Sequence, residues 1–425
     1  MQTSIPKVVI IGAGFGGLQA AKSLANTKLQ VILIDGNNHH LFQPLLYQVA
    51  SSALSPGEIA VPVRSVVNKF NNVQTVMDRV VSIDRLNRKV ILSEGEIEFD
   101  YLIVAPGSRH SYFGNEEWEK YATGLKNLED ALKIRENILS SFELAERYYH
   151  TKDASRYLTF VIVGGGPTGV ELAGAIAEIG RKTMLADFPL LTKNDIRVLL
   201  IEAGPRLLSA YPDELSDYTA TELQSLGVEV MLNTRINDVK KSYVIANDEK
   251  IEANTIIWAA GNTASPLTAT LETPLDKSGR VVVDSDLSIP SDEDIFVIGD
   301  AAFHINPDGK ITPGIAPAAT QQAVYTANVI KRRLNKSDRK PFVYFDKGSM
   351  ATIGKAKAVA VIGRMKIKGL SAWLLWSFIH IFFLIDFRNR YKVMSEWIWY
   401  YLTNRPGARL IVYNRFRKER EKVNT

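Results

Sequence analysis

The stretch VVIIGAGFGG, residues 8–17, joins a short apolar run to a turn rich in glycine. A dinucleotide-binding βαβ unit needs a strand, then glycines that permit a tight turn and a close backbone approach to the pyrophosphate, and then the start of a helix. Residues 7–11 supply the strand, and the apolar pattern of residues 18–24 indicates the helix. Asp35 closes the next apolar strand, at residues 30–34, where an acid that binds the ribose is expected. This stretch therefore predicts a dinucleotide-binding α/β unit.

A second stretch, FVIVGGGPTG at residues 160–169, repeats this design. Its acid is Glu202, which closes the strand at residues 197–201 and lies further from the glycines than the usual spacing. A loop around residues 187–194 can absorb the excess length. A carboxylate at this place binds a free 2′-hydroxyl and repels a 2′-phosphate, which favours NADH over NADPH, although Arg206 nearby weakens the inference. Two such units in one chain indicate that a flavin and a nicotinamide meet.

A third apolar strand, DIFVIGDAA at residues 294–302, ends in a Gly-Asp pair. In reductases with two dinucleotides, an aspartate such as Asp300 binds the ribityl chain of the flavin. Because it follows the second glycine turn, the first domain is expected to be discontinuous and to hold the flavin. The segments 101–107 and 255–261 also end in small residues and glycine. Each is either a crossing between domains or a buried strand followed by a turn.

Composition narrows the function further. The chain has 425 residues and no cysteine, which excludes disulfides, thiolate metal sites and thiol redox chemistry. Dithiol reductases and sulfide:quinone oxidoreductases are excluded on this ground. We expect no metal site, because no ligand cluster, triad or paired-carboxylate motif stands out. The first strand begins almost at once, without a signal sequence, so the catalytic body is expected in the cytoplasm.

The C-terminal region has a different character. Residues 370–385 read LSAWLLWSFIHIFFLI, about 16 residues against the ~20 that span a bilayer. Arginines and lysines follow between residues 388 and 422, and aromatic residues are dense in 391–402. This pattern predicts helices that lie in one leaflet of a membrane, with contact through residues 370–420. The alternative is a hairpin packed into a core or a dimer interface. No nucleic-acid motif accompanies the basic residues, and we expect no nucleic-acid partner.

Several stretches together resemble the type II NADH:quinone oxidoreductases, the non-pumping NADH dehydrogenases of respiratory chains. The resemblance covers essentially the whole chain. It is carried by residues 35–50, 107–114, 164–174, 299–302, 313–323 and 387–397. GGGPTGVELAG and PGIAPAATQQA are the most telling of these. The wider pyridine-nucleotide disulfide reductase group shares the glycine turns but not this set.

The resemblance implies an α/β fold with two Rossmann-like domains, for noncovalent FAD and for NADH, and a C-terminal amphipathic helical region that docks on a membrane. The expected boundaries are 1–112 and 285–345 for the FAD domain, 113–284 for the NADH domain with a linker helix at its start, and 346–425 for the docking region. It also implies a homodimer, peripheral on the cytoplasmic face of the cell inner membrane.

Site residues follow from the resemblance position by position. The flavin positions are Gly12, Ala13, Gly14, Phe15, Gly16, Asp35, His40, Val80, Gly107, Asp300, Pro317 and Ala318. The NADH positions are Gly164, Gly166, Pro167, Thr168, Gly169, Glu202 and Gly261. Glu171 matches an acid near nicotinamide and flavin that is a suspected proton or charge relay. From the residues alone, Glu171 is a carboxylate stabilised by a helix start.

The expected quinone contacts are Gln321, Gln322, Trp376 and His380. Many family members carry Ala-Gln-x-Ala-x-Gln beside the quinone, but here Pro317 replaces the first glutamine, so Gln321 is the better candidate. Trp376 could instead anchor in lipid, and His380 could be a packing histidine.

The expected reaction is hydride transfer from NADH to the flavin, followed by transfer of two electrons and two protons to a quinone, without proton pumping. Two other classes stay open at this point. One is a soluble NADH diaphorase or ferredoxin-type reductase that uses the C-terminal segment to dimerise. The other is a non-enzymatic flavoprotein that senses redox state.

Overall fold

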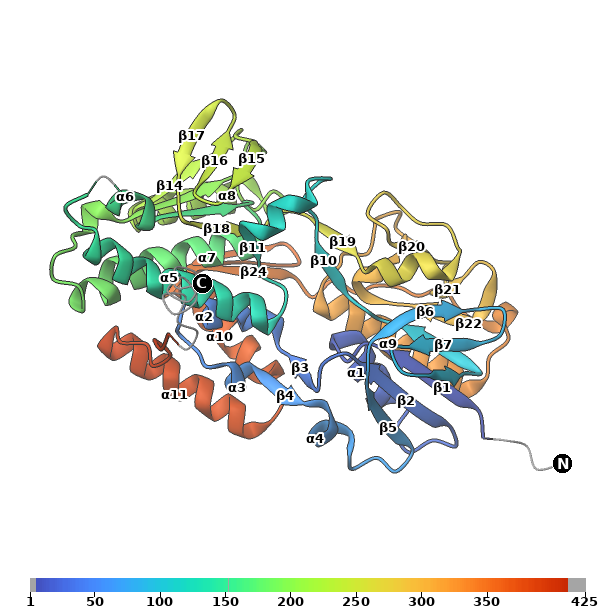
Figure 1. Ribbon diagram of the computed structural model, residues 1–425. Coiled ribbons are helices and arrows are strands. Elements are labelled where there is room, and N and C mark those ends of the chain that lie inside the picture. Colours follow the sequence, from blue (N-terminus) through green and yellow to red (C-terminus); the bar gives the residue numbers. More distant parts are fainter. Residues whose placement is uncertain (1–4, 152, 412–425) are drawn as a thin grey trace, which may run out of the picture. The chain divides into compact units, whose positions relative to one another are not determined.

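The computed structural model describes residues 5–151 and 153–411 (Figure 1). The chain divides into two compact units, and each is assembled from separate stretches of sequence. The first unit comprises residues 1–41, 60–109 and 262–347; the second comprises residues 42–59, 110–261 and 348–425. Residues from 348 onward therefore belong to the same unit as the second glycine turn. The domain boundaries given above stay a prediction.

A six-stranded sheet forms the centre of the first unit, in the order β21-β22-β9-β1-β2-β5. Its strands are β1 (Lys7–Ile11), β2 (Gln30–Asp35), β5 (Val73–Met77), β9 (Tyr101–Val104), β21 (Ser288–Ile289) and β22 (Asp292–Val297). All neighbours pair in parallel except β21, which is antiparallel to β22. The strand at residues 292–297 thus joins the same sheet as the first glycine turn.

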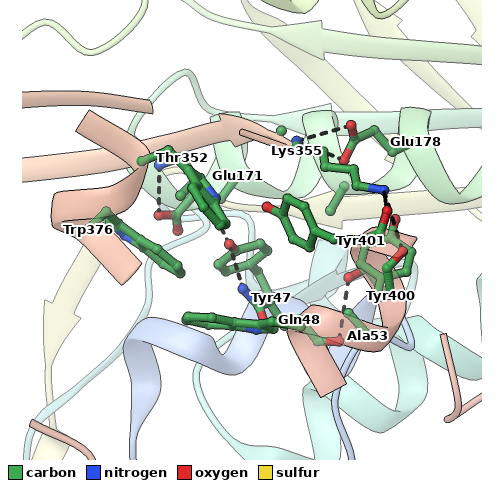
Figure 2. A pocket seen from close by; sticks show the side chains of 15 residues that line it. Tyr47, Gln48, Ala53, Glu171, Glu178, Thr352, Lys355, Trp376, Tyr400 and Tyr401 are labelled. Carbon is green, nitrogen blue, oxygen red and sulfur yellow. Dashed lines mark hydrogen bonds between the residues drawn. The ribbon is translucent and has the colours of Figure 1, made fainter. Parts of the chain in front are cut away.

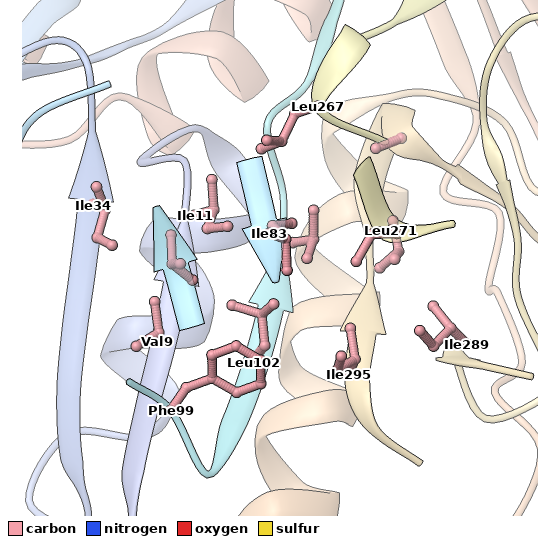
Figure 3. Packing of buried hydrophobic residues seen from close by; sticks show 14 of the residues in the cluster. Val9, Ile11, Ile34, Ile83, Phe99, Leu102, Leu267, Leu271, Ile289 and Ile295 are labelled. Atoms are coloured by element: carbon pink, nitrogen blue, oxygen red, sulfur yellow. The ribbon is translucent and has the colours of Figure 1, made fainter. Parts of the chain in front are cut away.

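Buried branched side chains hold this sheet together (Figure 3). Val9, Ile11 and Ile34 from β1 and β2 pack with Leu102 and Ile295 from β9 and β22. Strands of a parallel sheet are covered on both faces, which is why they read as continuous apolar runs rather than as alternating patterns. Helices α1 (Phe15–Ser23) and α9 (Ala316–Arg332) pack against each other. A small antiparallel sheet contains β6 (Val80–Asp84), β7 (Lys89–Leu92) and β8 (Glu96–Glu98).

The second unit has a five-stranded parallel sheet in the order β11-β18-β12-β13-β14. The strands are β11 (Ala122–Gly124), β12 (Thr159–Val163), β13 (Arg197–Ile201), β14 (Val228–Met231) and β18 (Thr255–Trp258). Helices α5 (Leu128–Arg147) and α7 (Pro167–Glu178) pack on this sheet, and α8 (Asp213–Ser225) contacts β14. A second antiparallel sheet contains β15 (Ile236–Lys240), β16 (Tyr243–Ala246) and β17 (Glu249–Glu252).

The C-terminal segment completes the second unit. It forms an antiparallel sheet of β24 (Ser349–Gly354), β25 (Lys357–Ile362) and β26 (Met365–Gly369), then α10 (Leu370–Phe383) and α11 (Phe387–Thr403). Strand β24 lies directly on α7, so close that a Cβ on Gly174 would be 1.8 Å from the carbonyl oxygen of Ile353. Helices α2 (Leu46–Ala50) and α3 (Pro56–Ile59) contact α7 and α11 respectively.

The remaining α-helices and strands are β3 (His39–Leu41), β4 (Ala60–Pro62), α4 (Val63–Val67), β10 (Ser108–His110), α6 (Ala154–Tyr157), β19 (Asn262–Ala264), β20 (Val281–Val282) and β23 (Ala302–Phe303). The predicted fold class, with two α/β nucleotide folds and a C-terminal helical region, is confirmed. Within the described ranges, none of the helices combines the length and the apolar character needed to cross a membrane.

Candidate functional site

The first glycine turn has room for a ligand directly ahead of α1. Gly12 has a φ of +95°, and a Cβ there would lie 2.2 Å from the carbonyl oxygen of Ala105. Gly14 faces open space, with no atom within 4 Å of an added Cβ. The start of a helix offers unpaired N–H groups and a positive dipole end to an anion. This cradle fits the pyrophosphate of a dinucleotide, and a side chain at Gly14 would fill it.

The glycine that allows close packing is Gly17, which the sequence reasoning did not single out. A Cβ on Gly17 would lie 1.7 Å from the carbonyl oxygen of Gly12. On Gly16 it would lie 3.2 Å from Cδ1 of Ile298, the end of a flexible side chain. Counting the G-x-G-x-x-G spacing from Gly12 would have identified Gly17. Gly16 as a flavin contact stays a prediction.

The second turn repeats the geometry of the first. Gly164 has a φ of +110°, and an added Cβ would lie 2.8 Å from the backbone of Ala259. Gly166 faces open space, and a Cβ on Gly169 would lie 1.8 Å from the carbonyl oxygen of Gly164. Pro167 occupies the first turn of α7, where its missing N–H has no helical partner to lose. The chain therefore holds two dinucleotide cradles of one design.

An acid sits beside each turn, as the sequence predicts. One carboxylate oxygen of Asp35 accepts a hydrogen bond from the backbone N–H of Ala13 at 2.6 Å. Glu202 accepts from the backbone N–H groups of Gly165 and Gly204, each at 2.6 Å. Arg206 forms its ion pair with Asp213 rather than with the acid of the second turn. The guanidinium of Arg206, which weakened the inference that the second turn prefers NADH, is thus paired with Asp213 and not with Glu202.

His40 is held against the first turn. Its Nδ1 donates to the carbonyl oxygen of Ala13 at 2.8 Å, and its ring meets Phe15 edge to face with centroids 5.1 Å apart. The side chain is buried, and burial is the main cause that lowers the pKa of His40 below its usual value. A neutral imidazole is therefore expected at neutral pH, with its proton on Nδ1 because a carbonyl only accepts.

Asp300 is oriented by two neighbours within its own unit. The hydroxyl of Ser108 donates to its carboxylate at 2.5 Å. The backbone N–H of Gly299 donates to Oε1 of Gln322 at 2.7 Å, which fixes the turn that carries Asp300. Gly107 comes just before Ser108, and an added Cβ there meets nothing within 4 Å. The side chain of Gln322 is buried, and its Oε1 is already bonded to the backbone N–H of Gly299. A hydrogen bond from Gln322 to a quinone would therefore have to come from its Nε2.

Gln321 is engaged in a similar way. Its amide makes two hydrogen bonds with the backbone of Phe345, one donated at 2.9 Å and one accepted at 3.0 Å. Pro317 and Ala318 lie in the first turn of α9, and Val80 begins β6 beside the core of the first unit. The quinone role of Gln321 stays a prediction and would require its side chain to leave Phe345.

A pocket opens in the second unit between α7, β24, α2 and the two C-terminal helices (Figure 2). Six of its fifteen lining residues are aromatic, and two acids and one lysine are also among them. The lining residues are Tyr47, Gln48, Ser51, Ala53, Glu171, Ala175, Glu178, Thr352, Gly354, Lys355, Trp373, Trp376, Trp397, Tyr400 and Tyr401. Of the predicted site residues, Glu171 and Trp376 are brought together here.

Glu171 is a buried carboxyl that lines this pocket, and its role as a proton carrier stays a prediction. Its Oε1 accepts a weak hydrogen bond from the backbone N–H of Thr352 at 3.5 Å, which favours the ionised form (Figure 2). Burial has the larger effect and raises the pKa of Glu171 to about 8. The carboxyl is therefore mostly protonated at neutral pH, unlike the ionised group that a helix start would stabilise.

Trp376 and His380 lie together on α10. Trp376 is only 2% exposed, so its alternative role as a lipid anchor is wrong. Its ring stacks on His380, with centroids 4.1 Å apart, and Nδ1 of His380 donates to the carbonyl oxygen of Trp376. Burial lowers the pKa of His380 to about 4. His380 is therefore neutral at physiological pH, which favours the packing role over proton delivery.

The sequence reasoning missed the polar residues that close the pocket. Glu178 accepts the backbone N–H of Lys355, and burial raises the pKa of its carboxyl. The ammonium group of Lys355 donates to the carbonyl oxygen of Tyr401 at 2.6 Å and to Oδ1 of Asn404 at 2.8 Å. A cation at this place stabilises the C-terminal end of α11. Glu178 lies seven residues after Glu171, on the same face of α7, and this spacing could have indicated from the sequence that both acids line one site. Nothing in the sequence around Lys355 indicated its place in the pocket.

Helices α10 and α11 also present an exposed apolar face. On α10 the exposed residues recur every four positions, so they share one side of the helix. We call this set the apolar face: Leu370, Leu374, Phe378, Phe382, Phe383, Phe387, Tyr391, Met394, Ile398, Trp399 and Leu402. Arg388 and Arg405 are exposed on or beside α11. The basic residues after position 411, for which the sequence predicts membrane contact, lie outside the described residues.

Comparison with known proteins gives a consistent result. A family described as pyridine nucleotide-disulphide oxidoreductase matches residues 6–323, and the NDH2 C-terminal domain matches residues 347–406. The type II NADH:quinone oxidoreductase Ndh of Mycobacterium tuberculosis is 42% identical over 418 residues, which cover 94% of this chain and 89% of that protein. NdhA of the same organism is 39% identical, covering 92% of this chain and 86% of that protein.

Among solved structures, NDH2 from Plasmodium falciparum in complex with NADH superposes with a TM-score of 0.87. At 22% identity, with 95% of this chain and 99% of that chain covered, this likeness shows a shared fold. The two matched family segments and the identity over nearly the full length place the protein: the chain belongs to the type II NADH:quinone oxidoreductase family.

Proposed function

We propose that this protein oxidises NADH with a bound FAD and passes two electrons to a quinone at a membrane surface, without moving protons across the membrane. The observation that carries the proposal is the pair of matching dinucleotide cradles, at Gly12–Gly17 and Gly164–Gly169, in a chain with no cysteine. Two cradles bind an electron donor and an electron carrier. Without thiols, the electrons must leave to an acceptor other than a disulfide.

We assign FAD to the first cradle. The N–H groups at the start of α1 and the open space at Gly14 fit its pyrophosphate, Asp35 would bind its ribose and Asp300 its ribityl chain. The other proposed flavin contacts are Ala13, Phe15, Gly16, His40, Val80, Gly107, Pro317 and Ala318. When bound, FAD supplies the two-electron chemistry, and the protein supplies orientation and electrostatics.

We assign NADH to the second cradle. The open space at Gly166 fits the pyrophosphate, and Glu202 would bind the ribose while repelling a 2′-phosphate. Pro167, Thr168 and Gly261 complete the proposed contacts. The protein is therefore expected to prefer NADH over NADPH.

We assign the quinone to the aromatic pocket that contains Glu171 and Trp376. A planar head group suits walls of Trp and Tyr rings, which stack on aromatic faces. Reduction to a quinol consumes protons, and the carboxyl of Glu171 holds one at neutral pH. Gln321, Gln322 and His380 are the other proposed quinone contacts, and each of these side chains makes a hydrogen bond with the backbone in the structure.

The assay that tests this function measures NADH oxidation by purified, FAD-loaded protein with and without a short-chain quinone. We expect rapid turnover only with quinone, and a much lower kcat/KM for NADPH than for NADH. Flavin reduction without reoxidation by quinone would point to a protein acceptor, and no flavin reduction would support the redox-sensor alternative. Equal kcat/KM for both nucleotides would contradict the role of Glu202.

We further propose that the apolar face inserts into the lipid surface, that the protein is a homodimer, and that it docks on the cytoplasmic face of the cell inner membrane. The proposed domain boundaries are those given from the sequence. Burial of one large apolar side chain contributes ~1.5–3 kcal/mol, so a few suffice for firm binding. Exposed arginines such as Arg388 would meet anionic head groups.

Substitution of Phe378 and Phe382 by serine should weaken vesicle binding by about a hundredfold, because two buried rings at ~1.5 kcal/mol each correspond to that factor. Both side chains are more than half exposed in the protein, so the fold should tolerate the change. Co-sedimentation with vesicles that contain anionic lipid measures the effect. The matched control is Leu86→Ser, which removes an exposed apolar side chain from the first unit. Equal losses in both proteins would rule out the apolar face as the docking surface.

A further inference from the structure

Four buried groups form a hydrogen-bonded chain from α11 to the strand that faces Glu171. The indole Nε1 of Trp397 donates to Oε1 of Gln48 at 2.6 Å. Nε2 of Gln48 donates to the hydroxyl of Tyr47 at 2.9 Å, and this hydroxyl lies 2.9 Å from Oγ1 of Thr352 (Figure 2). None of the four residues is more than 8% exposed. Buried groups of this kind hold fixed positions, because each lost partner leaves a polar atom unsatisfied.

The donor and acceptor roles of these groups set the direction in which the hydrogen bonds run. An indole nitrogen only donates, so the amide of Gln48 must turn its oxygen toward Trp397 and its NH₂ toward Tyr47. The hydroxyl of Tyr47 therefore accepts from Gln48, and Oγ1 of Thr352 is the neighbour at hydrogen-bond distance that can accept its own proton. With that proton directed at Thr352, every proton in this series of four hydrogen-bonded side chains points away from α11. Burial also raises the pKa of Tyr47 well above its usual value, so the phenol keeps its proton.

We propose that Gln48 is a positioning residue: held by Trp397, its amide turns the Tyr47 and Thr352 hydroxyls so that the proton of Thr352 is offered to a ligand in the pocket. The backbone N–H of Thr352 is already engaged by Glu171, while its hydroxyl proton is not needed by Tyr47. The ligand atom that this donor fits is a carbonyl oxygen. In terms of the proposed function, on which this inference rests, it is a carbonyl oxygen of the quinone.

A purely structural role makes a different prediction. If the four groups only satisfy one another, removing Trp397 Nε1–H or the Gln48 amide lowers stability and leaves ligand binding alone. If Trp397 acts through Gln48, the two changes affect the same interaction. Their effects then fail to add, which a double-mutant cycle detects.

The experiment compares Gln48→Met, Trp397→Phe and the double variant in the FAD-loaded enzyme with NADH and a short-chain quinone. We expect the KM for quinone to rise about tenfold in Gln48→Met, the factor for one lost hydrogen bond, and severalfold in Trp397→Phe. The double variant should be no worse than Gln48→Met. The loss should fall on KM more than on kcat, because the bond already forms with bound quinone. Trp118→Phe, a change at another buried tryptophan in the core around Tyr112, is the control.

A second readout does not depend on turnover. In protein labelled with ¹⁵N-tryptophan, the indole signal that disappears in Trp397→Phe identifies Trp397. It should move to the position of an unbonded indole in Gln48→Met. Additive KM effects, an unchanged KM in Gln48→Met, or an unmoved indole signal would each overturn the inference. If the unaltered protein reduces its flavin with NADH but no quinone at all, the proposed function fails first, and the inference falls with it.

Discussion

Replacing Glu171 by glutamine is expected to slow quinone reduction by about a hundredfold or more, the usual loss for a removed proton donor. Burial raises the pKa of this carboxyl to about 8, so it carries a proton at neutral pH. The rate in the unaltered enzyme should therefore fall as the pH rises through 8, and the variant should lack that inflection. The other titratable groups that sense its charge are the phenols Tyr47 and Tyr211, both of which have raised pKa values.

Stability gives the same substitution an independent readout. The pKa of Glu171 is higher in the folded protein, about 8, than in an unfolded chain, about 4.3. The folded state then binds the extra proton between these values, so stability falls as the pH rises through that window. Thermal unfolding of Glu171→Gln should show a shallower fall. Glu178→Gln should instead loosen the backbone of Lys355 and leave the pH profile of turnover in place. A pH profile that Glu171→Gln does not alter would contradict the proton role.

Two alanine substitutions in the first glycine turn are expected to separate folding from flavin binding. Gly17→Ala puts a methyl group 1.7 Å from a carbonyl oxygen, so the backbone must shift and both stability and bound flavin should be lost. Gly14→Ala meets no protein atom within 4 Å, so the apoprotein should unfold at the same temperature. Its methyl group occupies the cradle, and the Kd for FAD should rise at least tenfold, about 1.4 kcal/mol.

Flavin absorbance and thermal unfolding of the same preparations measure both effects. Gly57→Ala, at a glycine with open surroundings and an ordinary backbone, serves as control. If Gly14→Ala binds FAD as tightly as the unaltered protein, the pyrophosphate does not lie in the first cradle.

Much of the fold was predictable because its signals are local. A strand, a glycine turn, a helix start and an acid follow one another within a few dozen residues, and the backbone geometry at Gly12 and Gly164 has few alternatives. The order of the strands in the first sheet was harder to predict from the sequence. The placement of β22 beside β9 joins segments that are far apart in the sequence, and the pattern of Asp300 gave the one hint of it.

The pocket was largely beyond sequence reasoning. Tyr47 and Gln48 lie in a short helix with no periodic pattern, and Lys355 is one lysine among many. Their roles arise from contacts across the tertiary structure, such as that between Gln48 and Trp397. Hydrophobicity likewise could not tell a buried Trp376 from the exposed Phe378 two residues later, since the whole of α10 is apolar and only packing selects the covered side.

The pocket is assembled from helices that are synthesised at different times. The helices that carry Tyr47 and Glu171 leave the ribosome long before α10 and α11, which supply Trp376 and Tyr401. Until those last helices have folded, the pocket that Glu171 lines lacks the walls that they supply. A growing chain can therefore complete both glycine turns before this pocket is closed. The pocket is therefore complete only when the C-terminal helices have folded.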